Sequence, residues 1–97
     1  MFEVRRSTEF GNWLKSLRDV RAQARIESRI DRVENGNFGD AKFFDGIGEL
    51  RINYGPGYRL YFVQRDKVLI ILLCGGDKST QSRDIEKAMG MAKELRR

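Results

Sequence analysis

The chain has 97 residues, which is enough for one domain and too few for a second hydrophobic core. Its apolar share of 40% and charged share of 34% are those of an ordinary globular protein, and they exclude the disordered and membrane classes. Nineteen Lys and Arg against fourteen Asp and Glu give a net charge of +5. This charge favours a polyanion or an acidic protein as partner, the alternative being a basic surface without specificity.

Two residue counts limit the chemistry. Histidine is absent, which excludes Ser-His and Cys-His mechanisms and leaves Lys, Tyr, Asp and Glu for proton transfer. Cys74, the one cysteine, allows no disulfide within the chain and lies in an apolar run that favours burial. The N-terminal sequence has no signal-peptide pattern and no run is long enough to cross a membrane, so we expect a cytoplasmic protein without a membrane partner.

The first third of the chain is predicted to form a strand and two helices. Residues 2–4 alternate in polarity as a strand does, and Ser7 or Thr8 can cap the helix that follows. A second helix is predicted over residues 20–34, because apolar residues recur every three or four positions and Asn35-Gly36 is a stop signal. The two helices are expected to form a hairpin.

A series of arginines follows the apolar face of this second helix at spacings of three or four residues. The series consists of Arg18, Arg21, Arg25, Arg29 and Arg32. Guanidinium groups arranged in one stripe suit a phosphate backbone, which makes these residues candidate RNA ligands. The alternative is a solvated face on which neighbouring acidic residues balance the charge.

The rest of the chain is predicted to contain a loop, three strands and a last helix. The loop covers residues 35–46, and the strands cover residues 49–54, 58–65 and 68–74, the last of them apolar throughout. Gly75-Gly76 is expected to end the third of these strands, and Ser79 or Thr80 to cap the final helix. The sequence therefore predicts an α+β fold of order β-α-α-β-β-β-α, with a largely antiparallel sheet packed by helices.

The turn between the first two of these strands fixes their expected pairing. A three-residue turn, Gly55-Pro56-Gly57, places Tyr54 opposite Tyr58 on the core side. On the other face, which we expect to be open, it gives two pairs: Asn53 with Arg59, and Arg51 with Tyr61.

A candidate anion site follows the last strand. The segment Gly75-Gly76-Asp77-Lys78-Ser79-Thr80 does not match the phosphate-loop pattern, but a lysine at a helix N-terminus favours an anion. A plain turn is the alternative. We hypothesise that Arg51, Arg59 and Lys78 converge on one phosphodiester and stabilise its charge during attack by a ribose 2′-hydroxyl. This chemistry requires no metal and no cofactor. Otherwise the two arginines only solubilise the sheet.

Two segments carry a family resemblance: residues 49–62 (ELRINYGPGYRLYF) and residues 72–81 (LLCGGDKSTQ). With the start of the last helix, residues 84–88, they resemble the addiction-module killer proteins, a HigB-like branch of the RelE/ParE toxin superfamily. The resemblance extends over nearly the whole chain, so residues 1–97 are expected to form one toxin domain. It implies a type II toxin with a RelE-like fold. It also implies a cognate antitoxin, expected to have a helix-turn-helix, with which the toxin binds operator DNA.

For RelE-like members the resemblance implies an endoribonuclease that cleaves mRNA on the ribosome. Arg59 matches the arginine that contacts the scissile phosphate, and Lys78 matches a second basic residue of the family. Arg51 would hold phosphate with Arg59, and either Lys78 or Asp84 would transfer the proton. Tyr61 would stack on a base, beside Asn53 on the same face.

Two alternatives remain open at this stage. The chain lacks the histidine and the last-helix tyrosine of characterised relatives, which favours a ParE-like inhibitor that binds DNA gyrase through a protein surface. Alternatively, the protein has lost toxicity and acts with its antitoxin as a DNA-binding repressor.

Overall fold

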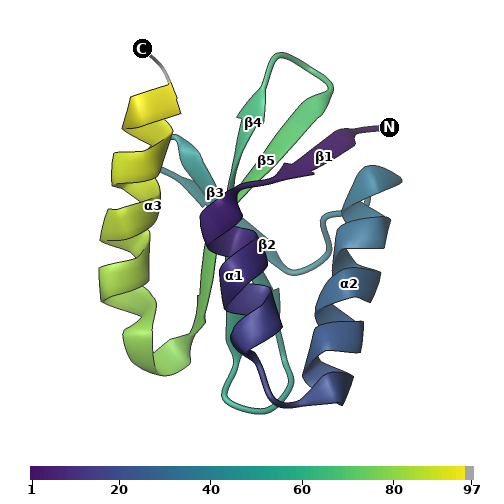
Figure 1. Cartoon of the computed structure of the whole chain (residues 1–97). Helices are drawn as coiled ribbons and strands as arrows, with labels where there is room; N and C mark the ends of the chain where they lie inside the picture. Colours follow the sequence, from purple (N-terminus) through teal and green to yellow (C-terminus); the bar gives the residue numbers. More distant parts are fainter. Residues whose placement is uncertain (96–97) are drawn as a thin grey trace.

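The computed structural model describes residues 1–95, which form a five-stranded sheet and three α-helices (Figure 1). In chain order the elements are β1 (Glu3–Arg6), α1 (Thr8–Ser16), α2 (Val20–Glu34), β2 (Ala41–Phe44), β3 (Ile47–Ile52), β4 (Tyr58–Arg65), β5 (Leu69–Asp77), a 3₁₀ turn (Lys78–Thr80) and α3 (Gln81–Leu95). None of the helices in this part of the chain is both long and apolar enough to span a membrane.

The sheet has the strand order β1-β5-β4-β3-β2. β1 runs parallel to β5, and the other neighbours are antiparallel, so the sheet is mixed. The predicted α+β class is confirmed. The predicted order is wrong, because residues 41–44 form a strand where a loop was expected. Asp45 and Gly46 have φ of 49° and 83° and join β2 to β3 in a two-residue hairpin.

The helices cover both faces of the sheet. α1 and α2 lie side by side, and α3 stands apart from them (Figure 1). The α1–α2 side encloses a cluster that includes Phe10, Ile26, Leu60 and Phe62. The α3 side encloses a second cluster, to which Tyr61, Val63, Leu73 and Ala88 belong. The face that was expected to be open is therefore covered by α3.

The helix starts follow from local capping. The Ser7 hydroxyl accepts a hydrogen bond from the Phe10 amide, and Asp19 accepts from two amides at the start of α2. The predicted span of α2 is confirmed. At the last helix the prediction is wrong, because Asp77 caps the 3₁₀ turn and α3 begins only after it.

The pairing of β3 with β4 differs from the prediction. Arg51 lies opposite Arg59, and Ile52 lies opposite Tyr58. The connection has five residues, 53–57, and not three, because the Gly57 amide donates to the Tyr54 carbonyl inside it. The two arginines are consequently direct cross-strand neighbours.

β5 continues through Gly75 and Gly76, which were expected to end it. A Cβ at Gly75 would lie 2.3 Å from the Trp13 ring, and one at Gly76 would lie 1.8 Å from a carboxylate oxygen of Asp84. The two glycines thus allow α1 and α3 to approach opposite faces of one strand. A register shift also occurs between Tyr61 and Phe62 where β4 pairs with β5.

Candidate phosphate-binding site

Three basic residues gather where β4, β5 and the start of α3 meet. Arg51 and Arg59 form a cross-strand pair, and Arg59 is in turn opposite Gly76 of β5. A Cβ at Gly57 would lie 3.0 Å from Nη1 of Arg59 and 3.5 Å from Cβ of Lys78, so these two residues flank the same turn. The Lys78 amide also donates to the Pro56 carbonyl, at 3.4 Å. Arg59 therefore neighbours both Arg51, across the strands, and Lys78, across the turn.

The three side chains differ in exposure. The side chain of Arg59 is 12% exposed and that of Arg51 is 36% exposed, and Lys78 belongs to the exposed residues. Nη1 of Arg59 donates to the Gly57 carbonyl at 2.7 Å. Lys78 also borders a cleft of about 330 Å³, whose lining is made by residues 78–83. Lys78 is thus the most exposed of the three cations and Arg59 the least.

Glu49, which the sequence did not single out as a site residue, lies at the centre of this group. Its side chain is fully buried. Oε1 accepts from Nε of Arg51 at 3.0 Å, and Oε2 accepts from Nε2 of Gln81 at 3.0 Å. Burial raises the pKa of Glu49, but the hydrogen bonds from Gln81 and Arg51 outweigh it, so the pKa is lowered overall. Glu49 is thus a buried, charged carboxylate.

Tyr61 does not belong to an accessible surface, and the prediction that it stacks on a base is wrong. Its side chain is fully buried beneath α3. Burial, followed by the nearby charge of Glu49, raises the pKa of the hydroxyl. Although it lies near Glu49, this hydroxyl has no partner in hydrogen-bonding geometry among residues 1–95.

Asp84 lies against the backbone of Gly76, and Gly76 is the residue of β5 that pairs with Arg59 of β4. It is buried, with 7% of its surface exposed, and accepts a hydrogen bond from the Thr80 hydroxyl at 2.5 Å. Its carboxylate is less accessible than the ammonium group of Lys78. Cys74, beneath the same helix, is buried as predicted, and burial raises the pKa of its thiol to about 12.

The arginines of α2 do not form one phosphate-binding stripe. Arg29 is buried, and its guanidinium donates to the carbonyls of Phe38, Asp40 and Arg51. Its candidate role in RNA binding is therefore wrong, because these carbonyls occupy its donors. Arg18 precedes the helix, in the connection between α1 and α2.

The other candidates from this region are exposed but dispersed. Arg21, Arg25 and Arg32 are exposed on α2, and Arg25 lies over the Tyr54 ring at 4.5 Å. Asn53 is exposed in the turn before β4 and is not opposite Arg59. Since α2 packs on the face of the sheet opposite α3, its exposed arginines do not extend the cluster around Arg59.

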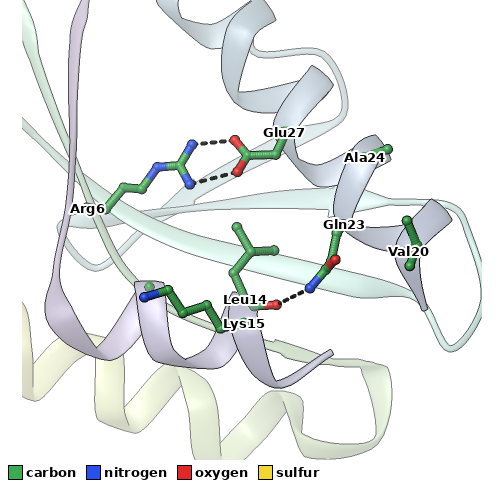
Figure 2. Close-up of a pocket in the computed structure, with 8 residues that line it drawn as sticks. Arg6, Leu14, Lys15, Val20, Gln23, Ala24 and Glu27 are labelled. Carbon is green, nitrogen blue, oxygen red and sulfur yellow. Dashed lines mark hydrogen bonds and ion pairs between the residues drawn. The ribbon is translucent and has the colours of Figure 1, made fainter. Parts of the chain in front are cut away.

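A larger cleft, of about 550 Å³, lies between β1, α1 and α2 (Figure 2). Across it, Arg6 donates two hydrogen bonds to Glu27, and the Gln23 amide donates to the Leu14 carbonyl. The hydrogen bond from Arg6 lowers the pKa of Glu27. Arg6, Glu27 and Gln23 thus have partners at this cleft, and none of the candidate site residues lines it. Among residues 1–95, no three metal-ligating side chains gather closely enough to hold an ion.

The fold and the site define a basic α+β protein with a cationic cluster at one end of a mixed sheet. No protein-family model matches the chain. An uncharacterized protein of Haemophilus influenzae is 51% identical to it over 94 residues, which cover 96% of this chain and 95% of that protein. The chain belongs to the same family as this Haemophilus influenzae protein.

Proposed function

We propose that the protein is a toxin of a type II toxin-antitoxin system, from the HigB-like branch of the RelE/ParE superfamily. In this proposal it inhibits translation in the cytoplasm by cleaving mRNA on the ribosome, without a metal ion. The observation that supports it most directly is the cross-strand pair of Arg51 and Arg59 with Lys78 beside the same turn.

The roles follow from exposure and charge. Arg51 and Arg59 hold the non-bridging oxygens of one phosphodiester, where negative charge grows as the 2′-hydroxyl attacks phosphorus. As the 2′-hydroxyl attacks, it gives its proton to solvent water, the bond from phosphorus to the 5′-oxygen breaks, and the leaving 5′-oxygen needs a proton. Lys78 supplies it, because its ammonium group is exposed whereas Asp84 is buried and bonded to Thr80. The products are a 2′,3′-cyclic phosphate and a 5′-hydroxyl.

The partners in this proposal are the ribosome with its mRNA and a cognate antitoxin. A basic surface fits both an RNA backbone and an acidic protein segment. The antitoxin, encoded beside the toxin and carrying a helix-turn-helix, would take the pair to operator DNA. A short reading frame of that kind immediately downstream would support the proposal.

The test is controlled expression with transcript ends mapped. Wild type should arrest growth and leave cleaved transcripts, and Arg59→Ala should relieve both, with a loss of cleavage of about 10²- to 10³-fold. Arg65→Ala is the matched control, because Arg65 lies at the other end of β4. Arrest with intact mRNA would exclude the nuclease. If supercoiling were also lost, the target would be gyrase, and harmless expression would indicate a repressor component.

A further inference from the structure

The buried carboxylate of Glu49 has no role in the chemistry proposed above, yet it is the acceptor around which the arginines are arranged. We propose that Glu49 is a positioning residue, whose carboxylate holds the Nε edges of Arg51 and Arg59 so that their terminal nitrogens face the phosphate. This inference rests on the proposed function of the same site.

The first support is the burial of a charge. An ionised carboxylate that is removed from water destabilises the folded protein by several kcal/mol unless charged or polar partners compensate it. Glu49 is fully buried in the middle of β3, and its two oxygens accept from Arg51 and Gln81. If Glu49 served only to fill this space, an apolar residue could replace it with little loss of folding stability, so its charge needs another explanation.

The second support is that both arginines turn the Nε atom of their guanidinium group toward Glu49. Nε of Arg51 donates to Oε1 at 3.0 Å, and Nε of Arg59 lies 4.0 Å from Oε2. The contact of Arg59 is an ion pair and not a hydrogen bond, and its buried Nε has no hydrogen-bond partner among residues 1–95. A guanidinium held at Nε keeps its terminal N–H groups for a second acceptor. In Arg59, the Gly57 carbonyl takes a bond from Nη1, which leaves Nη2 for an anion.

The third support is the link to α3. Gln81 is the first residue of α3, directly after the 3₁₀ turn that contains Lys78, and its side chain donates to Oε2 of Glu49. One carboxylate therefore connects Arg51 on β3, Arg59 on β4 and the start of the helix that follows Lys78. When the groups of a site come from three elements, a shared contact is needed to fix their relative positions, because a displacement of about 1 Å can lower the rate about 10²-fold.

Glu49→Gln separates positioning from general electrostatics, because it keeps the shape and removes the negative charge. If Glu49 acted only through its charge, removal would strengthen attraction for RNA and leave turnover unchanged or faster. If it positions the arginines, kcat on ribosome-bound mRNA should fall about 10- to 100-fold, with KM unchanged or lower. Glu49→Asp, which keeps the charge on a shorter stem, should recover part of kcat.

The controls keep this test independent of the proposed function. Glu86→Gln, an exposed glutamate of α3, should leave kcat unchanged. In ¹H–¹⁵N NMR spectra of the full chain, Glu49→Gln should shift the Nε–H signals of Arg51 and Arg59, whereas Glu86→Gln should shift neither. Unshifted signals, or an unchanged kcat in a folded Glu49→Gln variant, would overturn the inference. Shifted signals with a wild type that cleaves no mRNA would sustain the positioning of the arginines and remove only the nuclease.

Discussion

Burial and hydrogen bonding act in opposite directions on the carboxyl group of Glu49. Burial raises its pKa, the bonds from Gln81 and Arg51 lower it, and the bonds prevail. A carboxyl whose folded pKa is below its unfolded value binds fewer protons in the folded state between these two values. Its contribution to stability is therefore complete above the unfolded pKa, at about 4.3, and is lost as the pH falls through the folded pKa.

Glu49→Gln should accordingly flatten the acid side of the stability profile. Between about pH 5 and pH 2, the free energy of unfolding of the wild type should fall more steeply than that of the variant. Urea unfolding at a series of pH values measures both slopes. Glu86→Gln, on the surface of α3, should follow the wild type. Equal slopes for wild type and Glu49→Gln would mean that the carboxyl group is not stabilised in its charged form.

Arg29 shows how a side chain that resembles a ligand in the sequence can be structural. Its guanidinium satisfies carbonyls at the start of β2 and near the end of β3, in a buried position. Arg29→Ala should lower the free energy of unfolding by about 3 kcal/mol, because it removes the donors that Arg29 supplies to the carbonyls of Phe38 and Arg51. Arg32→Ala, one helical turn later and exposed, should change it by less than about 0.5 kcal/mol. Chemical denaturation compares the two, and similar losses would contradict this assignment.

At the scale of elements, the β2–β3 hairpin depends on its two turn residues. Asp45 and Gly46 both have positive φ, which glycine adopts freely and asparagine tolerates. Gly46→Ala should therefore lower the free energy of unfolding by about 1–2 kcal/mol, whereas Asp45→Asn should be nearly neutral. Thermal unfolding of the two variants tests this turn. A neutral Gly46→Ala would show that the hairpin closes differently.

The same hairpin shows what the sequence did and did not reveal about the elements. The span of α2 could be predicted, because an apolar period and a stop signal agree there. β2 was missed although the Asp45-Gly46 pair is a hairpin signal, since residues 41–44 do not alternate clearly. The pairing of β3 with β4 could not be derived from the Gly-Pro-Gly motif, because the length of that turn depends on hydrogen bonds within residues 53–57.

The proposed site, too, could be predicted only in part from the sequence. Arg51, Arg59 and Lys78 were identified because basic residues near a turn and a helix start are readable in a sequence. Glu49 was not identified, since a charged residue in an alternating strand indicates an exposed face. Only the packing of α3 over that face reveals that Glu49 and Tyr61 are buried. The identities of the residues thus led to the proposed site, and the packing of α3 shows which of these residues are buried.

At the scale of the whole molecule, the two faces of the sheet have different contents. The α1–α2 face holds an apolar cluster with Phe10 and Phe62 and the buried Arg29, which donates to main-chain carbonyls, whereas the α3 face combines apolar residues with the buried carboxylates of Glu49 and Asp84. Buried polar groups are tolerated where they have partners, and here Arg51 donates to Glu49 and Thr80 donates to Asp84. The buried charge on the α1–α2 face is thus a cation bonded to the main chain, whereas the α3 face holds buried carboxylates bonded to side chains.

The salt dependence of RNA binding can separate the contribution of the net charge of +5 from that of the cluster of Arg51, Arg59 and Lys78. Each phosphate contact with a single strand contributes about −0.7 to the slope of log K against log salt concentration. Contacts from Arg51, Arg59 and Lys78 should give a slope of about −2, and Arg59→Ala should reduce its magnitude by about 0.7. Arg65→Ala, at the far end of β4, should leave the slope unchanged. Fluorescence anisotropy of a labelled RNA, titrated with the protein at several KCl concentrations between about 50 and 300 mM, measures these slopes. If Arg59→Ala weakens binding without changing the slope, Arg59 does not contact a phosphate and the cluster acts only through the overall field.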